Sequence, residues 1–197
     1  MEQKERIGLA TWSTRDILLS AVLGAVFGAL YQAWNYLYVP LETISPILGD
    51  AAMYGFWFIA GILVPYIIRR PGAALLGEFL AGLISMLLGA QWAFDTLLSA
   101  FLQGLACEAV FFFVGRWKDY RLSTLMLAGV AAALLSFIHD YPLYGFAQLA
   151  VAVQVAMFIV RLISGAVLGG WLAKALGDAL AGTGVLDNYA IGIERRR

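Results

Sequence analysis

The sequence predicts an all-α integral membrane protein with six transmembrane helices and both termini in the cytoplasm. First, 62% of the 197 residues are hydrophobic and 13% are charged, about half the charged fraction of an average soluble domain. Second, the apolar residues gather in six runs, each close to the ~20 residues that a helix needs to cross a bilayer. Third, the basic residues alternate between the connections as membrane topology requires.

The six apolar runs follow one another along the chain with short breaks between them. They cover about residues 16–38, 51–68, 72–89, 93–115, 122–138 and 147–173. Each run is predicted to be helical, because a backbone that faces lipid must satisfy its own hydrogen bonds. The first run is long and follows polar residues, so we expect a retained span and not a cleaved signal peptide.

The basic residues indicate the orientation of the six spans. Twelve of the 13 Lys and Arg residues precede the first run or follow the second, fourth or sixth, and Arg161 lies inside the last. Cytoplasmic loops are enriched in such residues. We therefore expect a cytoplasmic segment 1–15, a six-helix membrane domain 16–175 and a cytoplasmic tail 176–197.

The opposite, outer side carries acids and aromatic rings. The acids are Glu42, Asp50, Asp95 and Asp140. They are either ordinary loop polarity or a mouth that attracts a cation. The aromatic residues near the first outer connection are Trp34, Tyr54 and Trp57. They belong either to an interfacial aromatic belt or to a site that stacks on a flat cationic ring.

Three ionisable residues lie inside the runs, at Glu78, Glu108 and Arg161. Such groups are costly in hydrocarbon and usually face the protein interior. The structural interpretation is one Arg–Glu pair that locks two helices, which leaves one acid protonated, hydrogen-bonded or in contact with a ligand. Gln103 lies about 140° around the helix from Glu108. Gln103 is the better ligand candidate and Glu108 the better structural one.

Other motifs are weaker. Ala21, Ala25 and Ala29 form a small-residue stripe that favours close helix approach, either within the chain or to another membrane protein. His139 has no neighbouring residues that would complete a metal site. The sequence contains no phosphate-binding loop, nucleophile elbow or nucleic-acid signature, so we expect no cofactor, no metal and no nucleic-acid partner.

Several long blocks, in order, resemble the YkoE-type S-components of energy-coupling factor (ECF) vitamin importers. The blocks are "YGFWFIAGILVPYIIRRPGAALLGEFLAGL" (54–83), "QGLACEAVFFFVGRWKDY" (103–120), "LSTLMLAGVAAALLSFIHD" (122–140), "VRLISGAVLGG" (160–170) and "TGVLDNYAIG" (183–192). The resemblance implies a six-helix subunit of a prokaryotic plasma membrane that binds one vitamin near its outer face. It also implies docking through the first helix on a membrane T-component that is coupled to two cytoplasmic ATPases.

The ligand implied by the resemblance is thiamine or its hydroxymethylpyrimidine (HMP) moiety. We expect Glu78 and Gln103 on the aminopyrimidine, Asp140 or another acid near the thiazolium, and Trp57 with Tyr54 stacked on the rings. Glu108, His139 and Trp34 complete the candidate ligand-binding residues, and Ala21, Ala25 and Ala29 are the candidate docking residues. The segment Val39–Asp50 is the proposed lid.

Two other functions remain open from the sequence. The first is an intramembrane enzyme that uses Glu78 and Glu108 as an acid pair, although the chain lacks a nucleophile or a set of metal ligands. The second is a structural membrane subunit that binds nothing. No ATPase motif occurs in the sequence, so an importer built on this chain takes its energy from partner subunits.

Overall fold

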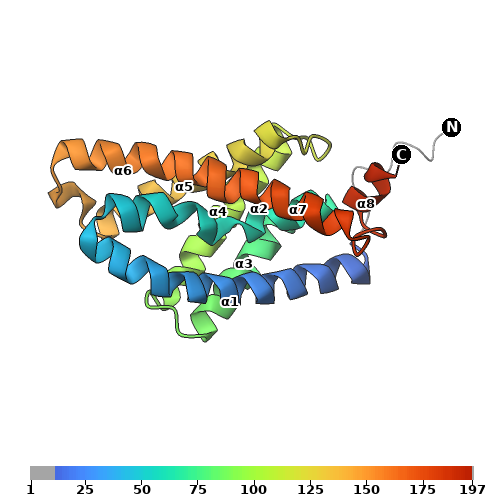
Figure 1. Ribbon diagram of the computed structural model, residues 1–197, viewed down its shortest axis with the longest axis horizontal. Helices are drawn as coiled ribbons and strands as arrows, with labels where there is room; N and C mark the ends of the chain where they lie inside the picture. Colours follow the sequence, from blue (N-terminus) through green and yellow to red (C-terminus); the bar gives the residue numbers. More distant parts are fainter. Residues whose placement is uncertain (1–11, 197) are drawn as a thin grey trace.

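The computed structural model describes residues 12–196, which form helices and their connections. The α-helices are α1 (Thr14–Ile44), α2 (Ala60–Ile68), α3 (Ala73–Leu87), α4 (Phe94–Phe113), α5 (Leu122–Leu143), α6 (Val151–Ser164), α7 (Leu172–Gly182) and α8 (Ala190–Arg195). Two π-helical segments, Ile47–Ala51 and Gly165–Trp171, and two 3₁₀ turns, Tyr54–Phe58 and Phe146–Gln148, lie between them. The helices pack into an elongated bundle (Figure 1).

Five helical stretches within the described residues are long and apolar enough to cross a membrane. They are Thr14–Ile44, Ile47–Ile68, Phe94–Phe113, Leu122–Leu143 and Val151–Gly182. α3 has 15 residues, which span about 22 Å at 1.5 Å per residue and fall short of a ~30 Å hydrocarbon core. The all-helical prediction is confirmed, and each predicted run coincides with one of these stretches or with α3.

The described ends of the chain lie at one end of the bundle, where α1 begins and α8 ends (Figure 1). The turn between α2 and α3 joins them there. Trp12 Nε1 donates to Pro71 O (3.0 Å) and Arg70 Nε donates to Asp16 Oδ2 (3.3 Å). Arg69 forms an ion pair with Glu194 of α8. The charge alternation in the sequence thus corresponds to two distinct ends of the bundle.

α2 lies at the centre of the fold. All of its residues are buried, because α1, α3, α4, α5, α7 and α8 surround it. The preceding turn is equally enclosed, since a Cβ built on Gly55 would lie 2.1 Å from the carbonyl oxygen of Ser164. This position directs the side chains that precede α2 into the bundle, whereas the sequence alone also allowed a lipid-facing aromatic belt.

α1 begins at a capping box and extends past the predicted lid. Ser13 Oγ accepts from Asp16 N (3.2 Å), and Asp16 Oδ2 accepts from Ser13 N (3.0 Å). The helix continues through Pro40 to Ile44, and a π-helical segment begins at Ile47. The segment Val39–Asp50, which we proposed as a lid, is therefore mostly helical and not a loop, because α1 continues beyond its apolar run.

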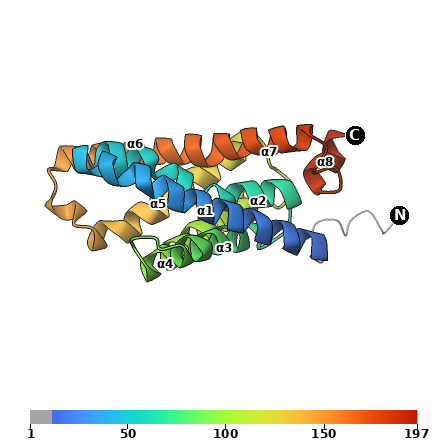
Figure 2. The same ribbon diagram turned by 60° about the horizontal axis from the view of Figure 1, so that its bottom comes forward.

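The last predicted boundary, at residue 175, falls inside a helix. α6, the π-helical segment and α7 form one continuous rod along the edge of the bundle in both views (Figure 2). After Gly182 the chain turns back, and Leu186 and Ile191 are buried in the core beside α2. Figure 2 also shows α3 and α4 side by side beneath α1, an arrangement that brings together the helices that carry Glu78 and Gln103.

Candidate functional site

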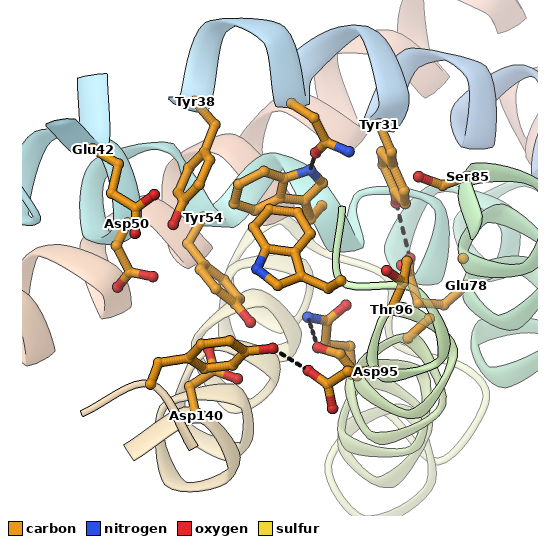
Figure 3. A pocket seen from close by; sticks show the side chains of 18 of the residues that line it. Tyr31, Tyr38, Glu42, Asp50, Tyr54, Glu78, Ser85, Asp95, Thr96 and Asp140 are labelled. Atoms are coloured by element: carbon orange, nitrogen blue, oxygen red, sulfur yellow. Dashed lines mark hydrogen bonds between the residues drawn. The ribbon is translucent and has the colours of Figure 1, made fainter. Parts of the chain in front are cut away.

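A cavity opens at the end of the bundle away from the described termini. Its empty volume, including the part open to solvent, is about 850 Å³. It is lined by Tyr31, Asn35, Tyr38, Glu42, Asp50, Tyr54, Trp57, Glu78, Gly82, Ser85, Trp92, Asp95, Thr96, Ser99, Ala100, Gln103, Asp140, Tyr144 and Phe146. Figure 3 shows Glu42 and Asp50 at one end and Tyr31 with Glu78 at the other.

Four aromatic rings form one wall of this cavity. Trp57 lies 5.0 Å from Tyr38, 5.5 Å from Tyr54 and 5.5 Å from Trp92, measured between ring centroids. The Trp57 indole is held by a hydrogen bond from Nε1 to Asn35 Oδ1 (2.9 Å). Edge-to-face contacts of this kind leave rigid ring faces for a flat ligand, and a cationic ring gains additional attraction there.

Glu78 forms the inner end of the cavity and is fully buried. Its Oε2 accepts hydrogen bonds from Tyr31 OH (3.0 Å) and Gly61 N (2.8 Å), as Figure 3 shows for the tyrosine. Its Oε1 has no hydrogen-bond partner within residues 12–196. A buried polar atom without a partner costs free energy. A ligand donor in the cavity would remove that cost.

Gln103 faces the same cavity from α4. It is 3% exposed, and its Nε2 donates to Ser99 Oγ (3.0 Å) one turn earlier on that helix. Carboxyl and amide groups from two helices thus line the same cavity, where they supply both acceptors and donors. This arrangement suits a heterocycle with ring nitrogens and an amino group.

Arg161 lies behind the opposite part of the wall and is fully buried. Its Nη1 donates to Asp140 Oδ2 (2.7 Å) and its Nη2 donates to Asp50 Oδ2. The guanidinium carbon lies 3.8 Å from the centroid of the Tyr54 ring. The predicted Arg–Glu pair is therefore wrong. α6 packs against α5 and the π-helical segment Ile47–Ala51, so aspartates are its acidic neighbours.

The cavity carries an excess of acid. Five carboxyl groups line it, and Arg161 pairs with two of them. Asp95 accepts a hydrogen bond from Tyr144 OH and lies 3.3 Å from His139 Nε2. Burial, and then the hydrogen bond to Asp95, raises the pKa of Tyr144 above its usual value, so this phenol stays protonated. Such a mouth attracts a cation.

Comparison with known proteins decides the family. The family "ABC-type cobalt transport system, permease component" matches residues 15–135. A protein of Bacillus subtilis (strain 168), named "Putative HMP/thiamine permease protein YkoE", is 38% identical over 189 residues, which cover 96% of this chain and 94% of that protein. A solved structure titled "Crystal structure of an S-component of ECF transporter" superposes with a TM-score of 0.90 at 39% identity, covering 94% of each chain.

The chain is a YkoE-type S-component of an ECF transporter. It is therefore the substrate-binding subunit of a membrane importer and not an enzyme. This S-component brings together five of the eight predicted ligand residues, and these five line the cavity: Glu78, Gln103, Trp57, Tyr54 and Asp140. Glu108, His139 and Trp34 are not part of the cavity wall.

The three remaining candidate ligand residues, Trp34, His139 and Glu108, lie outside the cavity wall and make other contacts. Trp34 stacks on Phe56 at 4.4 Å and donates from Nε1 to Met53 O (3.1 Å). His139 Nδ1 lies 2.9 Å from Asp140 Oδ1. Glu108 meets the first turn of α3 and does not approach Glu78 to form an acid pair, so nothing in the site supports the enzymatic alternative.

The sequence reasoning missed the contribution of α1 to the S-component cavity. Tyr31, Asn35 and Tyr38 point to one side of the helix, because they are spaced four and three residues apart. That spacing is the signal that separates them from Tyr36, which is 74% exposed. Trp92, in the connection between α3 and α4, has no comparable periodic signal.

The first helix of the S-component also has two rows of small residues with different surroundings. A Cβ built on Gly24 would lie 2.6 Å from Leu80 Cβ, and one built on Gly28 would lie 2.5 Å from Ile84 Cβ, so the glycine row packs closely on α3. The neighbouring row, Ala21, Ala25 and Ala29, is exposed on the surface of the bundle.

Proposed function

We propose that this S-component captures thiamine, or its HMP moiety, in the cavity and passes it through an ATPase-coupled ECF complex. The main support for the proposal is that the two ends of the cavity carry different chemical groups. Glu78 offers a buried carboxyl oxygen without a partner at one end. Aromatic rings and Glu42, an acid that Arg161 does not contact, lie toward the other end. Thiamine has a hydrogen-bonding heterocycle joined to a cationic ring, which matches this order.

The aminopyrimidine fits the inner end. Its amino group and ring nitrogens need an acceptor and a donor, which Glu78 and Gln103 supply. The thiazolium then lies among Tyr38, Tyr54 and Trp57, where ring faces favour a cation. Its counter-charge comes from Asp95 or Glu42, because Asp50 and Asp140 are already paired with Arg161. Of the two alternatives that the sequence left open near the thiazolium, Asp140 or another acid, this assignment takes the second.

The proposed topology has six spans with both termini in the cytoplasm. α3 completes the six spans as a short one, since it is apolar and packs between α1 and α4. The basic connections at the end near α8 then face the cytoplasm, in agreement with the bias of Lys and Arg. The cavity opens at the opposite end, toward the outside, where an importer must capture its substrate.

The proposed partners are a membrane T-component and two cytoplasmic ATPases. The exposed row Ala21, Ala25 and Ala29 supports this proposal, because small side chains let a second helix approach closely in lipid. The glycine row of the same helix is already occupied by α3. A second membrane protein therefore has one small-residue face of α1 available to it.

A ligand panel on the purified, detergent-solubilised protein tests the proposed substrate. Thiamine and HMP should each raise the melting temperature, because a ligand that binds only the folded state stabilises it. Riboflavin and biotin, which lack the aminopyrimidine, serve as controls and should leave it unchanged. Stabilisation by an unrelated vitamin, with no response to thiamine or HMP, contradicts the proposal.

A further inference from the structure

The carboxyl group of Glu108 caps a helix other than its own. Glu108 lies on α4, and its Oε1 accepts a hydrogen bond from Gly72 N at the start of α3. Its Oε2 accepts from Ala74 N (3.0 Å) and Leu75 N (3.3 Å). The first amides of an α-helix have no partner within the helix. Two amides of α3 and the amide of Gly72 immediately before it therefore depend on one side chain of α4.

α3 has no capping side chain of its own. Gly72 occupies the position before the helix with φ of +84°, a conformation that favours glycine, and it provides no side-chain oxygen. The remaining amide of the turn, Ala73 N, donates to Arg70 O (3.1 Å). A carboxylate at the start of a helix also interacts favourably with the helix dipole. Glu108 thus determines where the first turn of α3 sits against α4.

Glu78 follows this turn closely on the same helix. It lies four residues beyond Ala74, about 6 Å further along the axis. Two glycines enclose it: a Cβ built on Gly104 of α4 would lie 3.1 Å from Glu78 Cβ, and one built on Gly61 of α2 would lie 3.1 Å from the same atom. Close packing restricts the conformations of the Glu78 side chain. The position of its carboxyl group therefore depends on how α3 packs against α4.

One stretch of α4 both contacts α3 and lines the cavity, with two adjacent faces. Gly104 and Glu108 are one turn apart and both meet α3. Gln103 is adjacent to Gly104 and lines the cavity. We propose that Glu108 is a positioning residue, which holds α3 so that the Glu78 carboxyl lies at the correct separation from the Gln103 amide. This inference rests on the proposed function, because it concerns how the cavity recognises its ligand.

A double-mutant cycle separates positioning from a general contribution to stability. Thiamine and HMP are titrated into purified protein with Glu108→Ala, Glu78→Gln and both changes together, and each melting temperature is recorded without ligand. Glu108→Ala should weaken both ligands by on the order of ten-fold, as for one misplaced buried hydrogen bond. In the Glu78→Gln background it should change affinity by less than about two-fold, because coupled residues are not additive.

Ser13→Ala is the matched control, since it removes the cap of α1 at the same end of the bundle. It should lower the melting temperature and leave both affinities unchanged. Glu108→Gln keeps one acceptor oxygen and should fall between wild type and Glu108→Ala. Gly104→Ala moves α3 by crowding Glu78 directly, and it should show the same coupling to Glu78→Gln even if Glu108→Ala does not fold.

The outcomes distinguish this inference from the proposed function. Equal losses of affinity for Glu108→Ala in the wild-type and Glu78→Gln backgrounds overturn the positioning role, and so does a lowered melting temperature with unchanged affinity. Both leave the proposed function standing. Failure of the wild-type protein to bind thiamine and HMP overturns both. Loss of affinity that disappears in the Glu78→Gln background supports the inference.

Discussion

Arg161 Nη1 and Asp140 Oδ2 form a buried ion pair at 2.7 Å, and the same guanidinium binds Asp50 with its other terminal nitrogen. The pair joins α6 to α5, and the second contact joins both to the π-helical segment after α1. Two acids of the cavity wall therefore share one positive charge that lies behind them. The charge left for a ligand comes from the acids that Arg161 does not reach.

Arg161→Ala should destabilise the fold more than it weakens binding. The change leaves Asp50 and Asp140 buried without their counter-charge, and breaking such a pair costs ~3–5 kcal/mol. We expect a lower melting temperature and a lower folded yield in detergent, with affinity largely kept in the folded fraction. Combining Arg161→Met with Asp50→Asn and Asp140→Asn removes all three charges and should recover stability. Normal melting with abolished binding would place Arg161 in the ligand site instead.

Gln103→Leu should weaken the ligand without unfolding the protein. Leucine keeps most of the volume but removes the amide from the cavity, which leaves a ligand nitrogen without a partner. That loss costs ~1–3 kcal/mol, or roughly five- to 150-fold in affinity. Ser136→Ala is the control, because this buried hydroxyl of α5 lies outside the cavity. An effect near 0.6 kcal/mol, the average for hydrogen bonds between membrane helices, would show that Gln103 serves only packing.

Ala25→Leu should separate binding from transport. Ala25 is exposed on α1, so a larger side chain there has room in the isolated subunit but blocks a close approach by another helix. We expect unchanged thiamine affinity in the purified protein and no uptake in cells that express the complete importer. Gly24→Leu, one residue earlier, should instead destabilise the subunit, because Leu80 already fills that space. Loss of binding in Ala25→Leu would assign this row to internal packing.

Cysteine labelling tests the proposed topology. Cysteines at Thr43 and Gln91, which are exposed at the cavity end, should react with an impermeant thiol reagent added outside intact cells. Cysteines at Lys118 and Thr183, exposed at the other end, should react only after lysis. The native Cys107 is fully buried and gives little background. Labelling of the second pair in intact cells would reverse the orientation.

The sequence was most informative at polar residues that interrupt apolar runs. Glu78 and Gln103 are polar residues inside apolar runs, and hydrocarbon leaves few places for them, so both could be predicted to face a cavity. The partner of Arg161 could not be predicted. The depth of a residue along a helix does not tell which helices are neighbours, and Asp50 belongs to a segment expected to be a loop.

The misses on α1 and α3 have similar causes. Tyr31 and Tyr38 are typical of a membrane interface by composition, and only their helical spacing shows that they share an inward face. α3 continues for just 15 residues, because the apolar run that predicts it ends in a turn at Leu88 and Gly89. The cap by Glu108 is a contact between helices, to which no local pattern points.

Recognition of thiamine by Glu78 is tested most directly by the dissociation constant of thiamine, measured by titration of the purified wild type and Glu78→Gln side by side. Trp57 and Trp92 in the cavity wall provide an intrinsic fluorescence signal. We expect saturable binding at a single site in the wild type, and a loss of roughly five- to 150-fold in Glu78→Gln, because the unpartnered carboxyl oxygen is replaced. Absence of thiamine and HMP binding by the folded wild type, or equal affinities of the two proteins, would contradict this expectation.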